Sequence, residues 1–249
     1  MRIAVISDVH GNDIGFEAVL NDLRGETIDQ YVYLGDMIQG GPQPKQVVDR
    51  LRDLGAPVVL GNADDFLLKG YSAEDADTAP ERLLRLRTIR EWSIAQLDEA
   101  DRAYIGTFQP TVTIPLNADK QLLCFHGSPA SFDELIFPHT PEEEFERMLG
   151  AYSQHILTGG HTHMQQIRRI GDSFFFNPGS AGYAWSHNQP ADQFRADPWA
   201  EYALLSVDGG RIAVEFRKVP FDVAALREVY RRSGRPYADD SITQYSPRP

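Results

Sequence analysis

Short apolar runs alternate with helical patterns through the first 60 residues. Runs at residues 3–6, 31–34 and 57–60 have the length of buried strands, and a fourth run follows at 122–125. Between the first three, apolar residues recur three and four apart, at Phe16, Val19, Leu20 and Leu23 and at Val47, Val48, Leu51 and Leu54. This spacing predicts two amphipathic helices, with Gly55 as the C-terminal cap of the second. The alternation indicates a parallel sheet with right-handed crossovers.

The pattern changes between Asn62 and His126. Residues from about 65 to 107 are mostly helix-forming and carry several arginines. They predict a helical insertion over one side of the domain, which either packs against the fold or contacts the substrate. Residues 111–115 and 121–125 then predict a β-hairpin.

The C-terminal half contains sequence signals for further helices, strands and turns. Thr140, Pro141 and Glu143 form a predicted capping box that opens a helix, and Asp222 is expected to cap the last helix. Strands are expected at residues 156–158, 173–176, 202–207 and 212–216, with a tight turn at 208–210 joining the last two. The tail, about residues 235–249, is predicted to be irregular.

Length and composition fit a globular α/β protein. We interpret all 249 residues as a single domain, and no apolar run approaches the roughly 20 residues that span a bilayer. Cys124 is the only cysteine, so no intrachain disulfide is expected. Because the start passes straight into a strand-like run, the sequence favours a cytoplasmic location and no membrane partner.

The charge balance limits the partners. Lys plus Arg number 24 and Asp plus Glu number 36, giving a net charge of -12, so the long-range field repels a polyphosphate backbone and makes a nucleic acid an unlikely partner. A small phosphorylated substrate remains compatible, because two bound divalent cations would add roughly four positive charges locally. The sequence makes no prediction of oligomeric state.

Polar clusters follow the apolar runs directly. They supply seven candidate ligands, namely Asp8, His10, Asp36, Asn62, His126, His161 and His163. In extended backbone, residues two apart point to the same side, so Asp8 with His10 and His161 with His163 are expected to form pairs. Aspartate, asparagine and histidine suit hard and borderline divalent metals, and two-metal sites are common in phosphoryl chemistry.

The ordered set resembles the calcineurin-like metallophosphoesterase superfamily over about residues 1–220. The family blocks read here as Asp8-Val9-His10, Gly35-Asp36 through Gly41-Pro42, Gly61-Asn62, His126 and Gly160-His161-Thr162-His163. Asn177-Pro178-Gly179-Ser180 is similar to a block of the small bacterial cytosolic branch, and it either supports the site as a turn or binds substrate. The resemblance implies a sandwich of two mixed β-sheets flanked by helices, with the site at strand ends.

The resemblance also implies roles for the ligands. Asp8, His10, Asp36 and His163 would hold one ion, and Asp36 would bridge to a second ion held by Asn62, His126 and His161. The two divalent metals would be manganese, iron, zinc, nickel or cobalt. A hydroxide bridging them would attack the phosphorus in line, with Asp36, Asn62 and His126 as catalytic residues.

One position departs from the family pattern. Ala63 stands where many members have a histidine that assists the leaving group. Asp64, Asp65, His187 or an insertion arginine are the alternative donors, and Asp64 and His187 are the predicted substrate contacts. Asp64 has the alternative role of supporting the site or capping a helix. Residues 183–187 also differ from relatives, and Trp185 there either stacks on a substrate ring or packs internally.

The expected function is hydrolysis of small phosphodiesters, ahead of phosphomonoesters. A serine/threonine protein phosphatase and a dinucleoside polyphosphate hydrolase are alternatives on the same scaffold. A non-catalytic protein-interaction scaffold is a further alternative, which the retention of all seven ligands disfavours. The acidic charge and the lack of a basic stripe argue against a nuclease.

Overall fold

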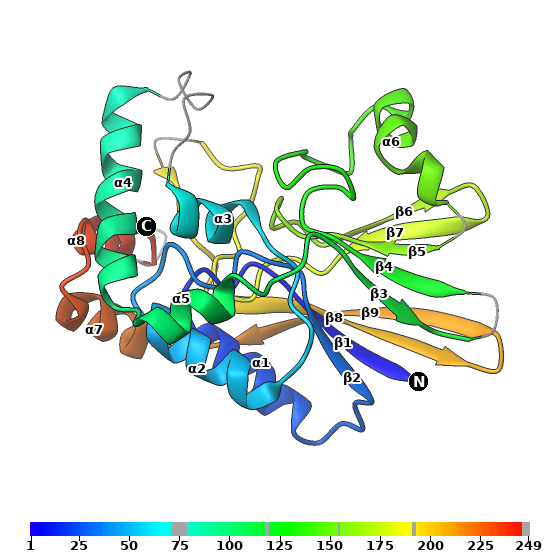
Figure 1. The fold of residues 1–249 in the computed structure, drawn as a ribbon, viewed down its shortest axis with the longest axis horizontal. Helices are drawn as coiled ribbons and strands as arrows, with labels where there is room; N and C mark the ends of the chain where they lie inside the picture. The colour runs from blue at the N-terminus through cyan, green and yellow to red at the C-terminus, as the bar shows by residue number, and fades with distance from the viewer. Residues whose placement is uncertain (71–78, 118–119, 154, 191–192, 246–249) are drawn as a thin grey trace.

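The fold is a sandwich of two mixed β-sheets with helices on the outside, as expected (Figure 1). The computed structural model describes residues 1–70, 79–117, 120–153, 155–190 and 193–245. Residues 71–78 of the predicted insertion and residues 246–249 of the predicted tail lie outside this part. The strand order is β2-β1-β8-β9 in the first sheet and β3-β4-β5-β7-β6 in the second.

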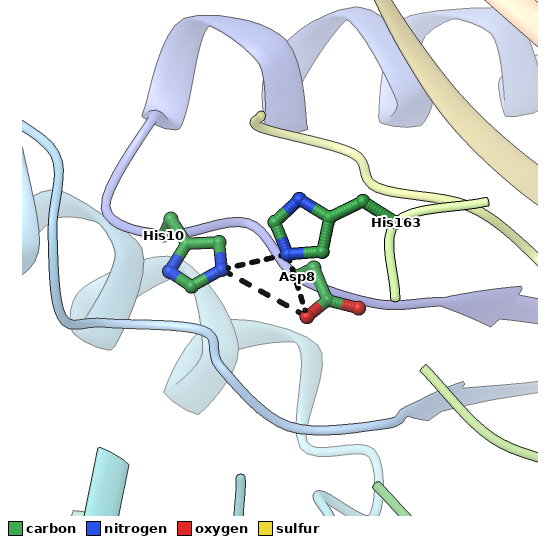
Figure 2. Close-up of side chains that lie close together, drawn as sticks. All are labelled: Asp8, His10 and His163. Carbon is green, nitrogen blue, oxygen red and sulfur yellow. Dashed lines mark hydrogen bonds and ion pairs between the residues drawn. The ribbon is translucent and has the colours of Figure 1, made fainter. Parts of the chain in front are cut away.

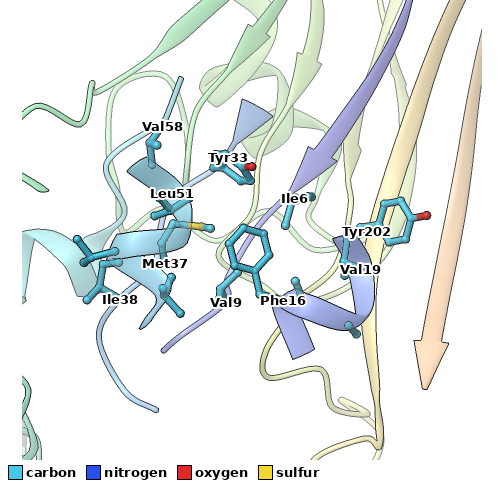
Figure 3. Close-up of a cluster of buried hydrophobic side chains, with 14 of the residues drawn as sticks. Ile6, Val9, Phe16, Val19, Tyr33, Met37, Ile38, Leu51, Val58 and Tyr202 are labelled. Atoms are coloured by element: carbon cyan, nitrogen blue, oxygen red, sulfur yellow. The ribbon is translucent and has the colours of Figure 1, made fainter. Parts of the chain in front are cut away.

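The first sheet is built around β1. Strand β1 (Arg2–Ile6) pairs in parallel with β2 (Gln30–Tyr33) and antiparallel with β8 (Trp199–Asp208), which pairs with β9 (Arg211–Pro220). Helices α1 (Asp13–Leu23) and α2 (Pro44–Leu54) pack Phe16, Val19 and Leu51 against this sheet (Figure 3). Gly55 ends α2 with φ 61°, which confirms the predicted cap.

The second sheet contains five strands. They are β3 (Val112–Pro115), β4 (Gln121–Cys124), β5 (Ile156–Thr158), β7 (Ser173–Asn177) and β6 (Gln166–Ile170). Strands β3 and β4 are antiparallel, which confirms the hairpin, while β4, β5 and β7 run parallel. Helix α6 (Glu142–Leu149) and the 3₁₀ turn η2 (Gly150–Tyr152) cover the outer face.

An apolar layer fills the space between the sheets. Ile3 and Val5 from β1 meet Leu122 and Cys124 from β4 in one cluster, while the alternate β1 residues face α1 and α2. Burial on both faces explains why these strands are apolar without alternation. Cys124 is fully buried, as predicted, and burial raises the pKa of its thiol.

The helices of the insertion and those at the C-terminus gather at one end of the sandwich. The predicted insertion contains α3 (Asn62–Lys69), α4 (Pro80–Ala95) and α5 (Glu99–Ile105). Figure 1 shows α4 beside the C-terminal helices α7 (Val223–Ser233) and α8 (Ala238–Gln244). Within the described residues, every helix is too short or too polar to cross a membrane.

Several local predictions were wrong. Residues 57–60 do not form a strand and make only isolated bridges at Val58 and Val59. Pro57 and Val59 bond to Tyr33 of β2, whereas Val58 and Leu60 bond to Gln109, so neither pairing is long enough for a strand. The capping box does not form, since Thr140 Oγ1 accepts from Phe137 N at 2.8 Å and Pro141 is the N-cap.

The C-terminal region also differs from expectation. Strand β6 was not predicted. Asp222 caps α7 as expected, by accepting from Ala225 N at 2.9 Å, but α7 is not the last helix. Helix α8 occupies part of the region predicted to be irregular, and its buried Ser241 and Ile242 anchor it to the fold.

Candidate metal centre

The structure brings all seven predicted ligands to one end of the sandwich. They follow the carboxyl ends of β1, β2, β4 and β5 and the bridged residues before α3. Parallel strands that end at one edge place their connecting loops together, which is where open α/β sheets bind ligands. The side chains divide into two groups of candidate ligands.

The first group consists of Asp8, His10 and His163 (Figure 2). The Nε2 atoms of His10 and His163 lie 3.1 Å apart, and Asp8 Oδ1 is 3.2 Å from His163 Nε2 and 3.8 Å from His10 Nε2. Three donor atoms from two distant segments of the chain therefore converge on one point.

The second group consists of Asp36, His126 and His161, with all donor atoms within 4.8 Å of one another. Asp36 Oδ2 lies 3.3 Å from His126 Nε2 and 3.7 Å from His10 Nε2 of the first group. Asn62 Oδ1 is 3.0 Å from His126 Nε2. Asp36 therefore lies between the groups, with Asn62 beside the second.

Backbone carbonyls orient three of the imidazoles. His10 Nδ1 donates to Gln39 O at 2.9 Å, His126 Nδ1 to Leu34 O at 2.8 Å and His163 Nδ1 to Tyr183 O at 2.7 Å. A carbonyl oxygen only accepts, so Nδ1 carries a proton, and in its neutral form each ring presents the Nε2 lone pair to the group. This arrangement is typical of metal-binding histidines.

The buried charges show that the donor set fits a cation. Burial opposes a charge on His126, but the adjacent Asp36 carboxylate raises its pKa to about 10. Burial likewise opposes a charge on His163, but the adjacent buried Asp8 carboxylate raises the pKa of that imidazole, so a proton lies between Asp8 Oδ1 and His163 Nε2 when no cation is bound. Divalent ions at the two groups would replace the protons that otherwise balance these carboxylates.

The backbone at the candidate ligands is not extended, so the reason given for pairing Asp8 with His10 and His161 with His163 was wrong. Six non-glycine residues in the described part of the chain have positive φ, and five of them are candidate ligands: Asp8, His10, Asp36, His161 and His163. Left-handed backbone is rare outside glycine and clusters at functional sites. Asp8 and His10 do converge, whereas His161 and His163 belong to different groups.

Two glycines permit the close approach of the ligand loops. A Cβ on Gly41 would lie 2.2 Å from His10 O, and one on Gly160 would lie 2.0 Å from Ser7 Oγ and 2.6 Å from Asp8 Oδ2. Any larger side chain at these positions would displace the loops that carry Asp8 and His10.

The block at residues 177–180 supports the ligand loops. Asn177 Nδ2 donates to Gly160 O at 2.6 Å and to Thr162 Oγ1 at 3.1 Å, and Ser180 Oγ donates to Asp8 O at 2.7 Å. Asn177 and Ser180 are fully buried. These contacts confirm the interpretation of the block as a supporting turn.

The two predicted substrate contacts are placed elsewhere. Asp64 is fully buried, and its carboxylate accepts from Met37 N at 3.0 Å and Ile38 N at 2.9 Å. The prediction of a substrate contact at Asp64 is therefore wrong, and its alternative role of supporting the site is confirmed. His187 Nε2 donates to Thr162 O at 2.8 Å, and its ring stacks on Trp185 at 3.7 Å, outside the cleft lining.

The candidate ligands open into a cleft of about 960 Å³. His10, Asp36, Asn62, His161 and His163 line it beside Ala63 and Asp65. The helical insertion forms one wall through α3 and α4, and the C-terminal helices contribute to another. Sequence reasoning missed Arg235 on that second wall, because no motif surrounds it.

Comparison with known proteins gives three relevant similarities. A family model described as the calcineurin-like phosphoesterase superfamily domain matches residues 1–209. An uncharacterized protein from Methanocaldococcus jannaschii is 44% identical over 245 residues, which cover 91% of this chain and 90% of that protein. The crystal structure of a metallophosphoesterase from Sphaerobacter thermophilus matches with a TM-score of 0.72 at 25% identity and covers 98% of each chain.

A shorter similarity is to a protein that is named for its activity. The symmetrical bis(5'-nucleosyl)-tetraphosphatase of Pectobacterium atrosepticum is 31% identical over 112 residues, which cover 40% of each chain.

Proposed function

Because the chain belongs to the calcineurin-like phosphoesterase superfamily, we propose that it hydrolyses small phosphorylated molecules, with phosphodiesters favoured. One observation carries the proposal: two groups of donors meet at Asp36 on the floor of a cleft. We also infer a cytosolic enzyme that acts as one domain over residues 1–249.

The geometry supports two metal positions. We assign Asp8, His10, Asp36 and His163 to one ion and Asp36, Asn62, His126 and His161 to the other. Manganese, iron, zinc, nickel and cobalt all suit this donor set. Two such ions, when bound, supply an activated water and neutralise charge on the phosphoryl group.

The side chains of the site are held in place before any ligand binds. Ala63 N donates to Asp36 Oδ1 at 2.7 Å, which leaves Oδ2 between the two groups. Carbonyl anchors fix the rings of His10, His126 and His163. Donors fixed in this way need little reorganisation, which favours electrostatic stabilisation of the transition state.

Metal removal tests the proposal directly. Protein reconstituted with manganese, iron, zinc, nickel or cobalt is expected to hydrolyse bis(4-nitrophenyl) phosphate, and chelation is expected to lower the rate at least about a hundredfold. The measurement combines nitrophenolate release with elemental analysis of the same preparation, which should show two ions per chain. A fully metal-loaded protein that hydrolyses none of a panel of diesters, monoesters and phosphopeptides would contradict the proposal.

A second candidate is a dinucleoside polyphosphate hydrolase. The similarity to the tetraphosphatase favours it, as do Lys69, Arg82, Arg85 and Arg235, which line the cleft of an otherwise acidic protein. Dinucleoside polyphosphates tested beside cyclic nucleotides and simple diesters on the reconstituted protein distinguish the two candidates.

Ala63→His is expected to restore assistance to the leaving group. Ala63 is the second residue of α3 and lines the cleft beside Asp36, so we expect an imidazole at this position to reach the reacting ester. A positioned general acid contributes 10²–10⁴-fold, so an unoptimised one should raise the rate about tenfold for an alkyl leaving group and less for nitrophenolate. Rates on a matched pair of alkyl and nitrophenyl diesters measure the effect.

Ala63→Phe is the control for that variant, because it adds an aromatic ring that has no proton to donate to the leaving group. If both variants change the two rates alike, the imidazole does not act as an acid at this position.

A further inference from the structure

Arg235 is a buried cation on the wall of the substrate cleft. Its side chain is only 8% exposed, and it lines the same cleft as His10 and Asp36. It lies between α7 and α8, beyond residue 209, where the match to the family model ends. Figure 1 shows these two helices beside α4.

The hydrogen-bond partners of the guanidinium among the described residues are all neutral oxygens, and its carbon lies 5.4 Å from the centre of the Tyr230 ring. Arg235 Nε donates to Gly40 O at 2.6 Å, and Nη1 donates to Pro236 O at 3.0 Å and Ser241 Oγ at 3.1 Å. No described aspartate or glutamate lies within ion-pair distance of it, and burial lowers the pKa of its guanidinium. A buried cation without a carboxylate partner is costly, so an anion entering the cleft would relieve that cost.

A second arginine lies nearby. Arg85 of α4 stacks over the ring of Tyr237 at 4.5 Å and pairs with Asp240 of α8. The charges of both Arg85 and Asp240 act on Arg235, in opposite directions, so this ion pair lies close to Arg235 at the same end of the cleft. Because Asp240 balances Arg85, the three side chains together carry one net positive charge, and Arg235 is the member that an anion in the cleft can balance.

The backbone beside Arg235 is strained in the same way as the metal centre. Tyr237 has φ 59°, and it is the sixth non-glycine residue with positive φ in the described part of the chain. The other five are candidate metal ligands. Strain of this kind is retained where the surrounding structure holds a side chain in a required place.

Arg235 is also connected to the metal centre. Its acceptor Gly40 follows Gln39, whose carbonyl orients His10. The guanidinium therefore lies near the first metal group without belonging to it. An anion bound by Arg235 would occupy the cleft beside the reacting phosphoryl group and not replace it.

We propose that Arg235 binds a second anionic group of the substrate, a carboxylate or phosphate several bonds from the phosphoryl group at the metal centre. The proposal rests on the proposed function and narrows the substrate class to phosphoesters that carry such a group. Arg235 then acts as a specificity-determining residue from a segment that the family model does not include.

Binding of matched phosphonates tests this assignment without turnover. Metal-loaded protein is titrated calorimetrically with ω-carboxyalkylphosphonates of two to six methylenes and with alkylphosphonates of equal length. At the best spacer, the wild type is expected to bind the carboxylate member at least about tenfold more tightly, as a charge-assisted hydrogen bond in a cleft implies. Arg235→Met should abolish this preference, and Arg235→Lys should restore part of it.

Arg232→Met is the matched control, because Arg232 is exposed on α7 and pairs with Glu228. It should leave the preference unchanged. Equal affinities for both phosphonate series at every length would overturn the proposal, as would a preference that survives in Arg235→Met. If Arg235 only supports the Gly40 loop, both series weaken equally in the Met and Lys variants, which also overturns it.

The same preparations separate this proposal from the proposed function. Hydrolysis of bis(4-nitrophenyl) phosphate is measured beside the titrations. If the protein prefers the carboxylate series but hydrolyses no ester, the anion site at Arg235 is supported and the proposed function is contradicted.

Discussion

Asp36→Asn is expected to lower kcat/KM for bis(4-nitrophenyl) phosphate by at least about a thousandfold. Asp36 Oδ2 lies 3.3 Å from His126 Nε2 and 3.7 Å from His10 Nε2, so it is the one carboxylate oxygen that both groups share. An amide has no charge to hold two cations and presents only one oxygen. The variant should therefore lose one or both ions, together with the negative charge that faces His126 and His10.

Elemental analysis and kinetics on the same preparation measure this effect. The bound metal should fall from two ions per chain to one or none. Asp49→Asn is the matched control, because Asp49 lies exposed on α2 and pairs with Lys45. A fully active Asp36→Asn variant with two bound ions would show that the groups do not share this residue.

Asn177→Leu is expected to destabilise the protein by about 3–5 kcal/mol, although Asn177 is not a candidate ligand. Its buried amide bonds to Gly160 O and Thr162 Oγ1 and accepts from Gly179 N. Leucine has a similar branched shape but is larger and makes none of these bonds. The two bonds that Asn177 donates cost about 1 kcal/mol each when lost, because Gly160 O still accepts from Thr162 N and Thr162 Oγ1 still bonds to Ile136 O. Gly179 N loses its acceptor, at about 1–3 kcal/mol. The loop carrying His161 and His163 would lose its support.

Urea denaturation of the apo and metal-loaded protein tests this expectation. The midpoint should fall in both states, and the metal affinity should fall as well. Asn188→Leu is the control, since Asn188 is exposed, and it should change neither quantity appreciably. An unchanged midpoint would show that the loop is held by other contacts.

The sequence predicted those parts of the fold that depend on local pattern. Apolar strands with Asp8, Asp36 and His126 at their ends were found because burial on both faces leaves an unbroken apolar run. The cap at Gly55 was found because left-handed backbone selects glycine. Such sequence signals lie within a few residues of the strand, loop or cap that they predict.

Other features could not be predicted because they depend on competing contacts, several of which involve residues distant in the chain. Thr140 fails to cap α6 because its hydroxyl bonds to Phe137 N, while Arg168 from β6 donates to its carbonyl. Helix α8 and the residue that follows it are held by contacts with Gly182, Tyr183 and Ala196 that no local pattern reports.

The candidate site shows the same division. Its ligands carry recognisable side-chain chemistry, but their anchors at Leu34, Gln39 and Tyr183 are backbone carbonyls that every residue type supplies. Arg235 was missed for a similar reason, since an isolated arginine in a tail has no sequence signal. Its position became clear only through the contact with Gly40.

The positive φ angles at five candidate ligands have a consequence for which sequences this scaffold accepts. Left-handed backbone costs roughly 1–2 kcal/mol for most residues, and aspartate and histidine are among the types that adopt it more readily. Backbone shape and metal chemistry therefore select the same side chains at these positions. A descendant that lost its ions would still be under pressure from folding to keep polar residues there. Ligand-like residues alone are thus weak proof of catalysis in a distant copy of this fold.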